Sequence, residues 1–332
     1  MSTGYYPYEN LVFEGGGVKG VAYGGVFEVL EQAQITPQIK AVAGTSAGAI
    51  NATMMSLNYS AAEVVDIMMS LNFEKLEDGG DLEGPFRLIE HYGWFKGNYF
   101  LKLMESYVEK KTRIGRKPGN GRATFRDLVE KYKDLNFKRL YVFGTNLSQQ
   151  CVQQFSYETT PDIAVADAVR ISMSIPFFFE ARYFKQNNEN DIYCDGGVLN
   201  NYPIDTFDEQ STAEEPGGTM LYRTPCQATL GFHFDNPDQP PSPPINNLRR
   251  FTGSVIDALL DIQDILLKTN PGDEQRTVFI NDLGVSFTNF KLSDQTKWDL
   301  IAQGRIATAN YLNNLPNPPQ KLPVIKRLLR RA

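Results

Sequence analysis

The start of the chain repeats one arrangement twice: a short apolar run, a glycine-rich turn, and a longer segment with helical spacing. Residues 11–13 end near three consecutive glycines, and residues 19–33 follow with valine and leucine at helical spacing. Residues 39–43 form a second apolar run, which leads through another glycine turn into the small, mostly apolar residues 47–57. This alternation predicts an α/β protein with a largely parallel sheet, because parallel neighbours need a crossover helix between them.

The same alternation continues toward the C-terminus. Residues 61–71 predict an amphipathic helix, with Ser60 as its N-cap and Glu63 three residues later. Residues 74–97 are a looser stretch that is either a lid or an ordinary long loop, and the proline-rich residues 235–245 form a semi-rigid connection. Further helices are predicted over residues 98–113, 124–132, 248–267 and 294–312, and further strands over residues 140–145, 152–157, 191–194, 228–234 and 278–281.

The composition excludes several classes of protein. Of 332 residues, 42% are hydrophobic and 22% are charged, which argues against a disordered chain or a coiled coil. The net charge of −6 argues against a nucleic-acid partner, since nucleic-acid binders are usually basic. The cysteines Cys151, Cys194 and Cys226 form no CxxC pair, so they indicate neither a disulfide framework nor a zinc site and fit a reducing compartment.

The N-terminus has neither a basic start nor a long apolar stretch, so we expect no secretory signal. The most apolar long stretch, residues 41–57, is too short and too polar to span a bilayer. We therefore expect a cytoplasmic protein that meets membranes peripherally, from the aqueous side. Export without a signal peptide stays open.

The first glycine-rich turn, residues 15–20, can bind an anion. Because Gly15, Gly16 and Gly17 lack Cβ atoms, backbone N–H groups can approach a phosphate or an oxyanion, and the following helix N-terminus adds partial positive charge. The turn also matches the dinucleotide pattern G-x-G-x-x-G, but the second apolar run ends without the acid that would bind a ribose. The Lys-Ser/Thr pair of an ATP-binding loop is also missing after Gly20, so a nucleotide site is disfavoured.

The second turn, Gly44-Thr45-Ser46-Ala47-Gly48, matches G-x-S-x-G between an apolar strand and an apolar helix. That context is typical of a nucleophile elbow, which exposes the serine hydroxyl at the edge of a sheet. The N–H of Ala47 can then point at a developing oxyanion. The alternative is a glycine-rich turn that contains a serine by chance, but the glycine loop upstream favours the elbow.

A third segment, Asp195-Gly196-Gly197, follows the apolar run over residues 191–194. An acid at the end of a strand can reach another loop at the sheet edge, so Asp195 could act as the base for Ser46. The alternative is a simple turn, because Asp-Gly is a common turn dipeptide.

A serine nucleophile normally has a histidine base, and the chain has only His91 and His233. His91 lies in the loose stretch, and His233 alternates with phenylalanines in a predicted strand. Neither pattern links a histidine to Ser46, which favours a Ser–Asp dyad.

Taken together and in this order, the three segments resemble the motifs of patatin-like phospholipases. The family's glycine loop with a basic residue near its end is similar to residues 15–20, with Lys19 as the basic residue. Its G-x-S-x-G is similar to residues 44–48, and its D-G-[AG] to residues 195–197. Weaker similarities are found over residues 201–203, 170–179 and 284–312, so the resemblance covers about residues 10–312.

The resemblance implies a three-layer α/β/α fold and lipid acyl hydrolase activity. It implies Ser46 as nucleophile, Asp195 as base, and Gly15, Gly16 and Gly17 as oxyanion donors. Residues that shape the motifs are Lys19, Gly20, Gly44, Gly48, Gly196 and Gly197. No metal or organic cofactor is expected, and calcium is not expected because the sequence has no acidic calcium loop.

One segment departs from the family pattern. Arg170 stands in a stretch that is usually alanine-rich. The three phenylalanines over residues 177–179 either line an acyl site or, as we prefer, pack into the core.

We expect an N-terminal tail over residues 1–9, an acyl hydrolase domain over residues 10–315 with its motifs within residues 10–208, and a basic amphipathic segment over residues 316–332. Residues 321–332 carry five basic residues and no acid, interleaved with apolar ones. This pattern indicates either a short helix that docks on anionic lipid or a terminal helix packed on the domain.

The sequence thus predicts a phospholipase A-type enzyme that cleaves fatty-acyl esters of membrane phospholipids. A neutral-lipid lipase, a lysophospholipase or an acyltransferase could use the same site. A catalytically silent protein that binds a membrane or a partner is the alternative from another class. The resemblance also allows an activating protein partner, and the sequence leaves positional preference and oligomeric state open.

Overall fold

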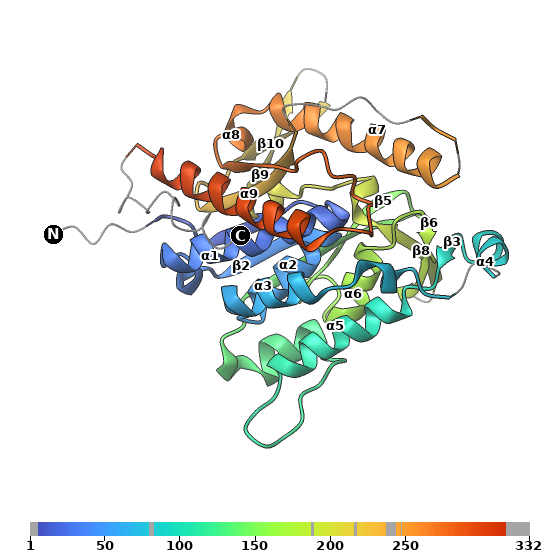
Figure 1. Cartoon of the computed structure of the whole chain (residues 1–332). Coiled ribbons are helices and arrows are strands. Elements are labelled where there is room, and N and C mark those ends of the chain that lie inside the picture. The colour runs from blue at the N-terminus through green and yellow to red at the C-terminus, as the bar shows by residue number, and fades with distance from the viewer. Residues whose placement is uncertain are drawn as a thin grey trace.

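The computed structural model describes residues 6–79, 83–186, 189–215, 218–236, 244–246 and 248–316. Its centre is an eight-stranded sheet, which lies between helices in Figure 1. The strand order is β12-β11-β1-β2-β4-β8-β7, with β5 also paired to β4. These strands are β1 (Asn10–Phe13), β2 (Ala41–Thr45), β4 (Arg139–Asn146), β5 (Cys151–Phe155), β7 (Arg182–Gln186), β8 (Glu189–Asp195), β11 (Thr229–Asp235) and β12 (Thr277–Asn281). The pairs from β12 to β4 are parallel, whereas β4–β5, β4–β8 and β8–β7 are antiparallel.

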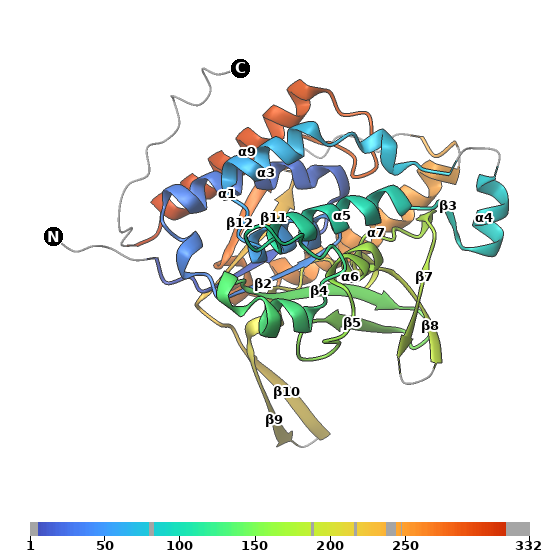
Figure 2. The same ribbon diagram turned by 90° about the horizontal axis from the view of Figure 1, so that it is seen from below.

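Helices cover both faces of this sheet, which makes the fold a three-layer α/β/α arrangement, as predicted. Figure 2 shows α1, α3 and α9 lying together along one side of the sheet. The helices are α1 (Tyr23–Gln32), α2 (Ala47–Ser56), α3 (Ala61–Ser70), α4 (Gly84–Glu90), α5 (Asn98–Lys111), α6 (Val165–Ser172), α7 (Leu248–Lys268), α8 (Pro271–Glu274) and α9 (Asp294–Asn313).

The alternation of side chains along β1 divides the core between the two faces. Leu11 and Phe13 point into the larger core, which also contains residues of α1, α2, α3, α5, α6 and α9. Val12 points to the other face, where it belongs to a smaller cluster with Ile204 and Leu267 of α7. Both faces of the parallel strands are therefore buried, as is usual for such sheets.

Most predicted elements are present with small shifts at their ends. The capping box of α3 forms as predicted, because the Ser60 and Glu63 side chains each bind the other residue's backbone N–H. The predicted helix over residues 19–33 is divided into a 3₁₀ segment, η1 (Gly17–Ala22), and α1. Gly17 has φ +55, a left-handed conformation that tightens the turn before the α-helix begins.

Several elements escaped prediction. The loose stretch over residues 74–97 contains α4 and a strand, β3 (Gly93–Phe95), which pairs with β6 (Phe177–Phe179). The hairpin of β9 (Glu209–Glu215) and β10 (Gly218–Thr224) is missed because β9 has one apolar residue, Ala213, and so shows no apolar alternation. Helix α6 is missed because it is short and contains the buried Arg170.

Two glycines allow α1 and α9 to pack with their backbones close together. A Cβ at Gly25 would overlap the carbonyl oxygen of Ile301, and a Cβ at Gly304 would overlap that of Ala22. A side chain at either position would therefore push α9 away from α1, the helix that connects β1 to β2.

We predict that Gly25→Ala lowers the free energy of unfolding by about 1–3 kcal/mol, because overpacking outweighs the gain in helix propensity. The control is Gly253→Ala in α7, where a Cβ meets no described atom within 4 Å. It should be neutral or stabilise by about 0.5–1 kcal/mol. Urea denaturation measures both variants, and equal effects would contradict the close-packing argument.

Candidate active site

Ser46 lies in a sharp turn between β2 and α2. Its backbone has φ 53 and ψ −122, a strained conformation for a residue with a Cβ. Such a turn is the geometry of a nucleophile elbow, and it places the side chain at the carboxyl end of β2. The Ser46 side chain lines a pocket but is only 6% exposed as a residue.

The first glycine turn lies against the same pocket. Gly15, Gly16 and Gly17 all line it, and Gly17 takes its positive φ where a Cβ would overlap the carbonyl oxygen of Phe287. The N–H of Gly15 donates to the carbonyl of Asn201 at 3.0 Å, so it is not available to an oxyanion. This corrects the expectation for Gly15. The N–H groups of Gly16 and Gly17 donate no hydrogen bond to the residues that the structure describes.

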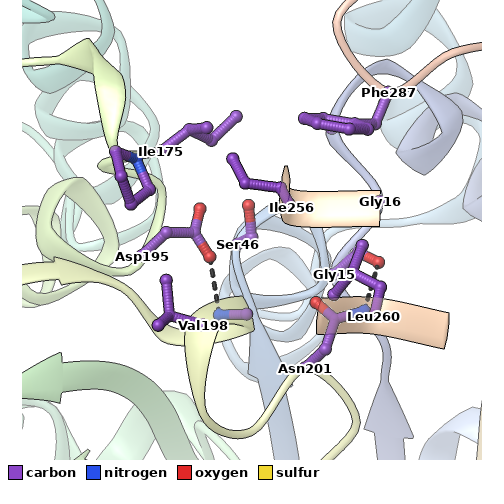
Figure 3. A pocket seen from close by; sticks show the side chains of 13 residues that line it. Gly15, Gly16, Ser46, Ile175, Asp195, Val198, Asn201, Ile256, Leu260 and Phe287 are labelled. Atoms are coloured by element: carbon purple, nitrogen blue, oxygen red, sulfur yellow. Dashed lines mark hydrogen bonds between the residues drawn. The ribbon is translucent and has the colours of Figure 1, made fainter. Parts of the chain in front are cut away.

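Asp195 reaches the pocket from the end of β8. Strand β8 runs antiparallel to β4, and Asp195 at its end pairs with Gly144 of β4. The preceding residue of β4, Phe143, pairs with Thr45, which is next to Ser46. Asp195 and Ser46 therefore lie on either side of β4 at the same edge of the sheet. The Asp195 carboxylate and the Ser46 hydroxyl point into the same space, with Ile175, Ile256 and Phe287 around it (Figure 3).

Burial raises the pKa of Asp195 from its usual 3.8 to about 7, while the N–H of Gly197 and the hydroxyl of Ser46 act in the opposite direction. The Gly197 N–H donates to Oδ1 at 2.7 Å. The other oxygen, Oδ2, is buried and accepts no hydrogen bond of standard geometry from the described residues. This oxygen is therefore placed to accept a proton.

Asn201, four residues after Gly197, binds the glycine turn from the segment that follows Asp195, although it is not among the predicted site residues. Its Nδ2 donates to the carbonyl of Gly15 at 3.1 Å and to Oε1 of Glu14 at 2.8 Å. Its own N–H donates to Oε1 of Gln263 in α7 at 2.7 Å. The similarity of residues 201–203 to the family's N-x-P element was the signal that could have found it.

The end of α6 supports the turns that carry Ser46 and Asp195. The N–H of Ser46 donates to Oγ of Ser172 at 2.8 Å, and the N–H of Asp195 donates to the carbonyl of Ser174 at 2.9 Å. Arg170 is fully buried and donates to Oγ of Ser174 and to the carbonyls of Lys96 and Gly97. The departure at Arg170 thus has a structural role, which is to fix this end of α6.

The other motif residues lie around this centre. Lys19 forms an ion pair with Asp282 at 2.5 Å, and its side chain is 21% exposed. Glycines allow three close approaches: a Cβ at Gly20 would crowd Ala47, a Cβ at Gly44 would overlap Gly48, and one at Gly196 would overlap Phe143. Gly48 similarly lies against the backbone of Phe13.

Neither histidine lines the described part of the pocket. His91 is exposed at the end of α4. His233 is buried in β11, where Nε2 lies 3.0 Å from Oδ1 of Asp264 and 3.4 Å from Oε1 of Glu14. Burial raises the pKa of Glu14 to about 7, and the carboxylates of Glu14 and Asp264 raise that of His233.

Glu14, His233 and Asp264 are the one group of the described residues whose ligand atoms all lie within 4.8 Å of one another, a spacing that could hold a metal ion. Each of these ligands is already engaged. The N–H of Phe234 and Nδ2 of Asn201 donate to Glu14, and Nε2 of His233 bridges the two carboxylates. The protein's own hydrogen bonds account for the arrangement.

The preferred prediction that the three phenylalanines pack into the core holds for two of them and is wrong for Phe177. Phe178 and Phe179 are buried and pack on Phe95 and Phe290, whereas Phe177 is 51% exposed. None of them lines the described part of the pocket. The residues described over 74–97 do not line it either, and its apolar wall comes from Ile256 and Leu260 of α7.

A second cavity lies behind the nucleophile turn and shares Gly17 with the first. Its walls are almost wholly apolar and come from η1, α2, α3 and α5. They include Ala47, Ile50, Met54, Met68, Phe100 and Met104. Methionine-rich walls can adapt to flexible apolar ligands.

Residues 11–208 match the patatin-like phospholipase family, and the chain belongs to this family. Membership of this family indicates that the chain is an enzyme that hydrolyses lipids. No described helix combines the length and the apolar character that a bilayer span requires. The basic segment predicted over residues 316–332 lies, except for residue 316, outside the described residues.

The chain is also similar to individual proteins. The chain is 30% identical to the uncharacterized protein YqhO of Bacillus subtilis (strain 168) over 313 residues, which are 92% of this chain and 98% of YqhO. It is 31% identical to the probable lipid hydrolase 463L of Invertebrate iridescent virus 6 over 205 residues, 60% of this chain and 62% of 463L. The crystal structure of VipD from Legionella pneumophila has the same fold, with a TM-score of 0.57 and 18% identity over 92% of this chain and 67% of VipD.

The raised pKa of Asp195 predicts a pH-dependent gain in stability for Asp195→Asn. In the folded wild type, the Asp195 carboxyl keeps its proton up to about pH 7, whereas in the unfolded chain it loses the proton near pH 3.8. The wild type therefore loses stability as the pH rises between these values, and an uncharged asparagine does not. At about 1.4 kcal/mol per pKa unit, the variant should gain a few kcal/mol more at pH 8 than at pH 5. Thermal unfolding at both pH values measures this difference. The control is the exposed Asp162, whose pKa Arg126 lowers, and Asp162→Asn should show no such gain.

Proposed function

We propose that this chain is a phospholipase A-type acyl hydrolase that cleaves fatty-acyl esters of membrane phospholipids through Ser46 and Asp195. The observation that carries the proposal is the meeting of a strained serine turn and a buried carboxylate in one pocket beside unengaged backbone N–H groups. Membership of a lipid-hydrolysing family supports the class of substrate.

In the proposed reaction, Oγ of Ser46 attacks the ester carbonyl carbon while Asp195 accepts its proton. The N–H groups of Gly16, Gly17 and Ala47 stabilise the oxyanion of the tetrahedral intermediate. The bond to the glycerol oxygen then breaks, and that oxygen takes the proton from Asp195. Water hydrolyses the acyl-enzyme in a second cycle, with Asp195 again as base, and releases the fatty acid.

The environment of Asp195 supports its use as a base without imidazole. An ordinary exposed aspartate is too weak a base to activate a serine near neutral pH, because its pKa lies near 4. Burial brings the pKa of Asp195 to about 7, where a base is most effective at neutral pH.

The shape of the site supports an acyl ester as substrate. Apolar side chains of α7, Ile175 and Phe287 line the pocket over Ser46. The second cavity continues from Gly17 and Ala47 between α2 and α5, and its apolar walls suit a fatty-acyl chain. The walls contain few polar groups, which suits an apolar chain better than a sugar or a peptide.

We predict that Ser46→Ala and Asp195→Asn each lower fatty-acid release from phosphatidylcholine by roughly 10²–10⁴-fold, because one removes the nucleophile and the other the base. His91→Ala and His233→Gln, which alter the two histidines of the chain, should keep most of the activity.

Fatty-acid release from a panel of phospholipids, lysophospholipids and triacylglycerols measures these effects and distinguishes the substrates. Activity that survives both dyad substitutions, or that is lost only in a histidine variant, would overturn the mechanism. A fluorophosphonate probe that never labels the folded wild type would instead indicate a silent protein.

The same pKa predicts the pH dependence of catalysis. Because Asp195 must be ionised to accept the proton, kcat/KM should rise with pH through an apparent pKa near 7 and then level off. Initial rates on a soluble ester between pH 5 and 9 test this. A rate already at its plateau at pH 5 would contradict a base with a raised pKa.

A further inference from the structure

Helix α7 presents a different surface on each of three sides. At 3.6 residues per turn, its side chains fall into an inner face toward the pocket, an outer apolar face and a charged side. The inner face contacts the protein, whereas the outer face is exposed in the described structure.

The inner face of α7 forms one wall of the catalytic pocket. Ile256 and Leu260 lie in that wall, close to Ser46 (Figure 3). Gln263 accepts a hydrogen bond from the N–H of Asn201 at 2.7 Å and donates to the carbonyl of Gly197 at 2.9 Å. The helix thus covers the pocket and binds the segment that follows Asp195, at Gly197 and Asn201.

The outer face carries six large apolar side chains and spans about 120° of the helix. Their exposed fractions lie between 36% and 64%, and these residues are Phe251, Val255, Leu259, Ile262, Ile265 and Leu266. No described charged side chain falls within this face. The adjacent side is charged: Asp257 and Asp261 lie there with Arg250 and Lys268, and Asp264 contacts His233 from the same side.

The size of this face favours a lipid surface over a protein as its occupant. A helix of 21 residues is about 30 Å long and about 10 Å wide, so one face offers roughly 300 Å². A stable protein interface buries about 800 Å² on each partner. An interfacial helix, in contrast, needs only one apolar face buried among lipid headgroups.

The charges near the face select the kind of lipid. The outer face is neutral, and the adjacent side carries both exposed acids, Asp257 and Asp261, and exposed cations, Arg250 and Lys268. This mixture gives anionic headgroups no basic patch to bind. A zwitterionic surface needs no such patch, and it also presents the class of ester that the pocket is proposed to accept.

We propose that the outer face of α7 binds a zwitterionic lipid surface and so brings the mouth of the catalytic pocket against its substrate. The proposal rests on the proposed function, because it takes the lipid as the substrate of the pocket beneath the helix. A lipid that enters beside α7 has to move only from the surface to Ser46, without crossing water.

The test measures vesicle binding separately from hydrolysis. We expect the double substitution Ile262→Gln with Leu266→Gln, placed in Ser46→Ala protein, to lower co-sedimentation with phosphatidylcholine vesicles at least tenfold. In the active protein, the same pair should lower fatty-acid release from these vesicles at least tenfold. Hydrolysis of a monomeric short-chain ester should stay unchanged, because the outer face does not line the pocket.

The matched control is Ile114→Gln, which alters an apolar residue of 50% exposure in the turn after α5 and should leave binding unchanged. Ile265→Gln alone is a milder variant if the double one does not fold. Unchanged vesicle binding by folded variants would overturn the proposal. So would light scattering that shows a wild-type dimer dissociated by the double substitution. If the soluble ester is never hydrolysed while vesicle binding follows these expectations, the proposed function fails and the docking surface stands.

Discussion

The burial of the Asp195 carboxylate next to Ser46 is the constraint on which the rest of the site depends. A buried carboxylate without a cationic partner is costly, and the groups that favour its charged form are one backbone N–H, from Gly197, and the Ser46 hydroxyl. That cost has to be offset elsewhere in the fold. The same burial makes the carboxylate basic enough to replace an imidazole, so stability and reactivity are opposed at this residue.

The surrounding polar groups hold the backbone in place and leave the reacting groups unengaged. Ser172 accepts the N–H of Ser46, and Asn201 accepts the N–H of Gly15 while binding its carbonyl. These contacts orient the serine turn and the glycine turn, which carry the N–H groups of Ala47, Gly16 and Gly17. Since the supporting groups satisfy one another, the walls around Ser46 can be apolar, and Oδ2 of Asp195 is the buried polar atom of the described pocket lining that is left without a hydrogen bond.

The parts of the fold that could be predicted from the sequence are those set by local chemistry. The serine turn, the glycine turn and the capping box of α3 each depend on a few neighbouring residues, and all three are present. The antiparallel direction of β8 could not be predicted, because the alternation of apolar residues does not report on strand direction. The role of Arg170 depends on carbonyls about 70 residues away, and the hydrogen bond of Gly15 on a loop almost 190 residues away. No local pattern encodes these contacts.

Helix α7 is an element that the sequence predicts without showing how it packs. Its sequence predicts a helix over residues 248–267, but apolar residues on two of its sides do not show which side meets the protein. The structure distinguishes them, because the side with Gln263 binds the segment after Asp195, at Gly197 and Asn201. The carbonyl of Asn201 in turn accepts the N–H of Gly15. Helix α7 therefore supports the backbone that positions Asp195 and Gly15, while its outer side stays exposed. One helix thus carries both a wall of the pocket and the face proposed to bind lipid.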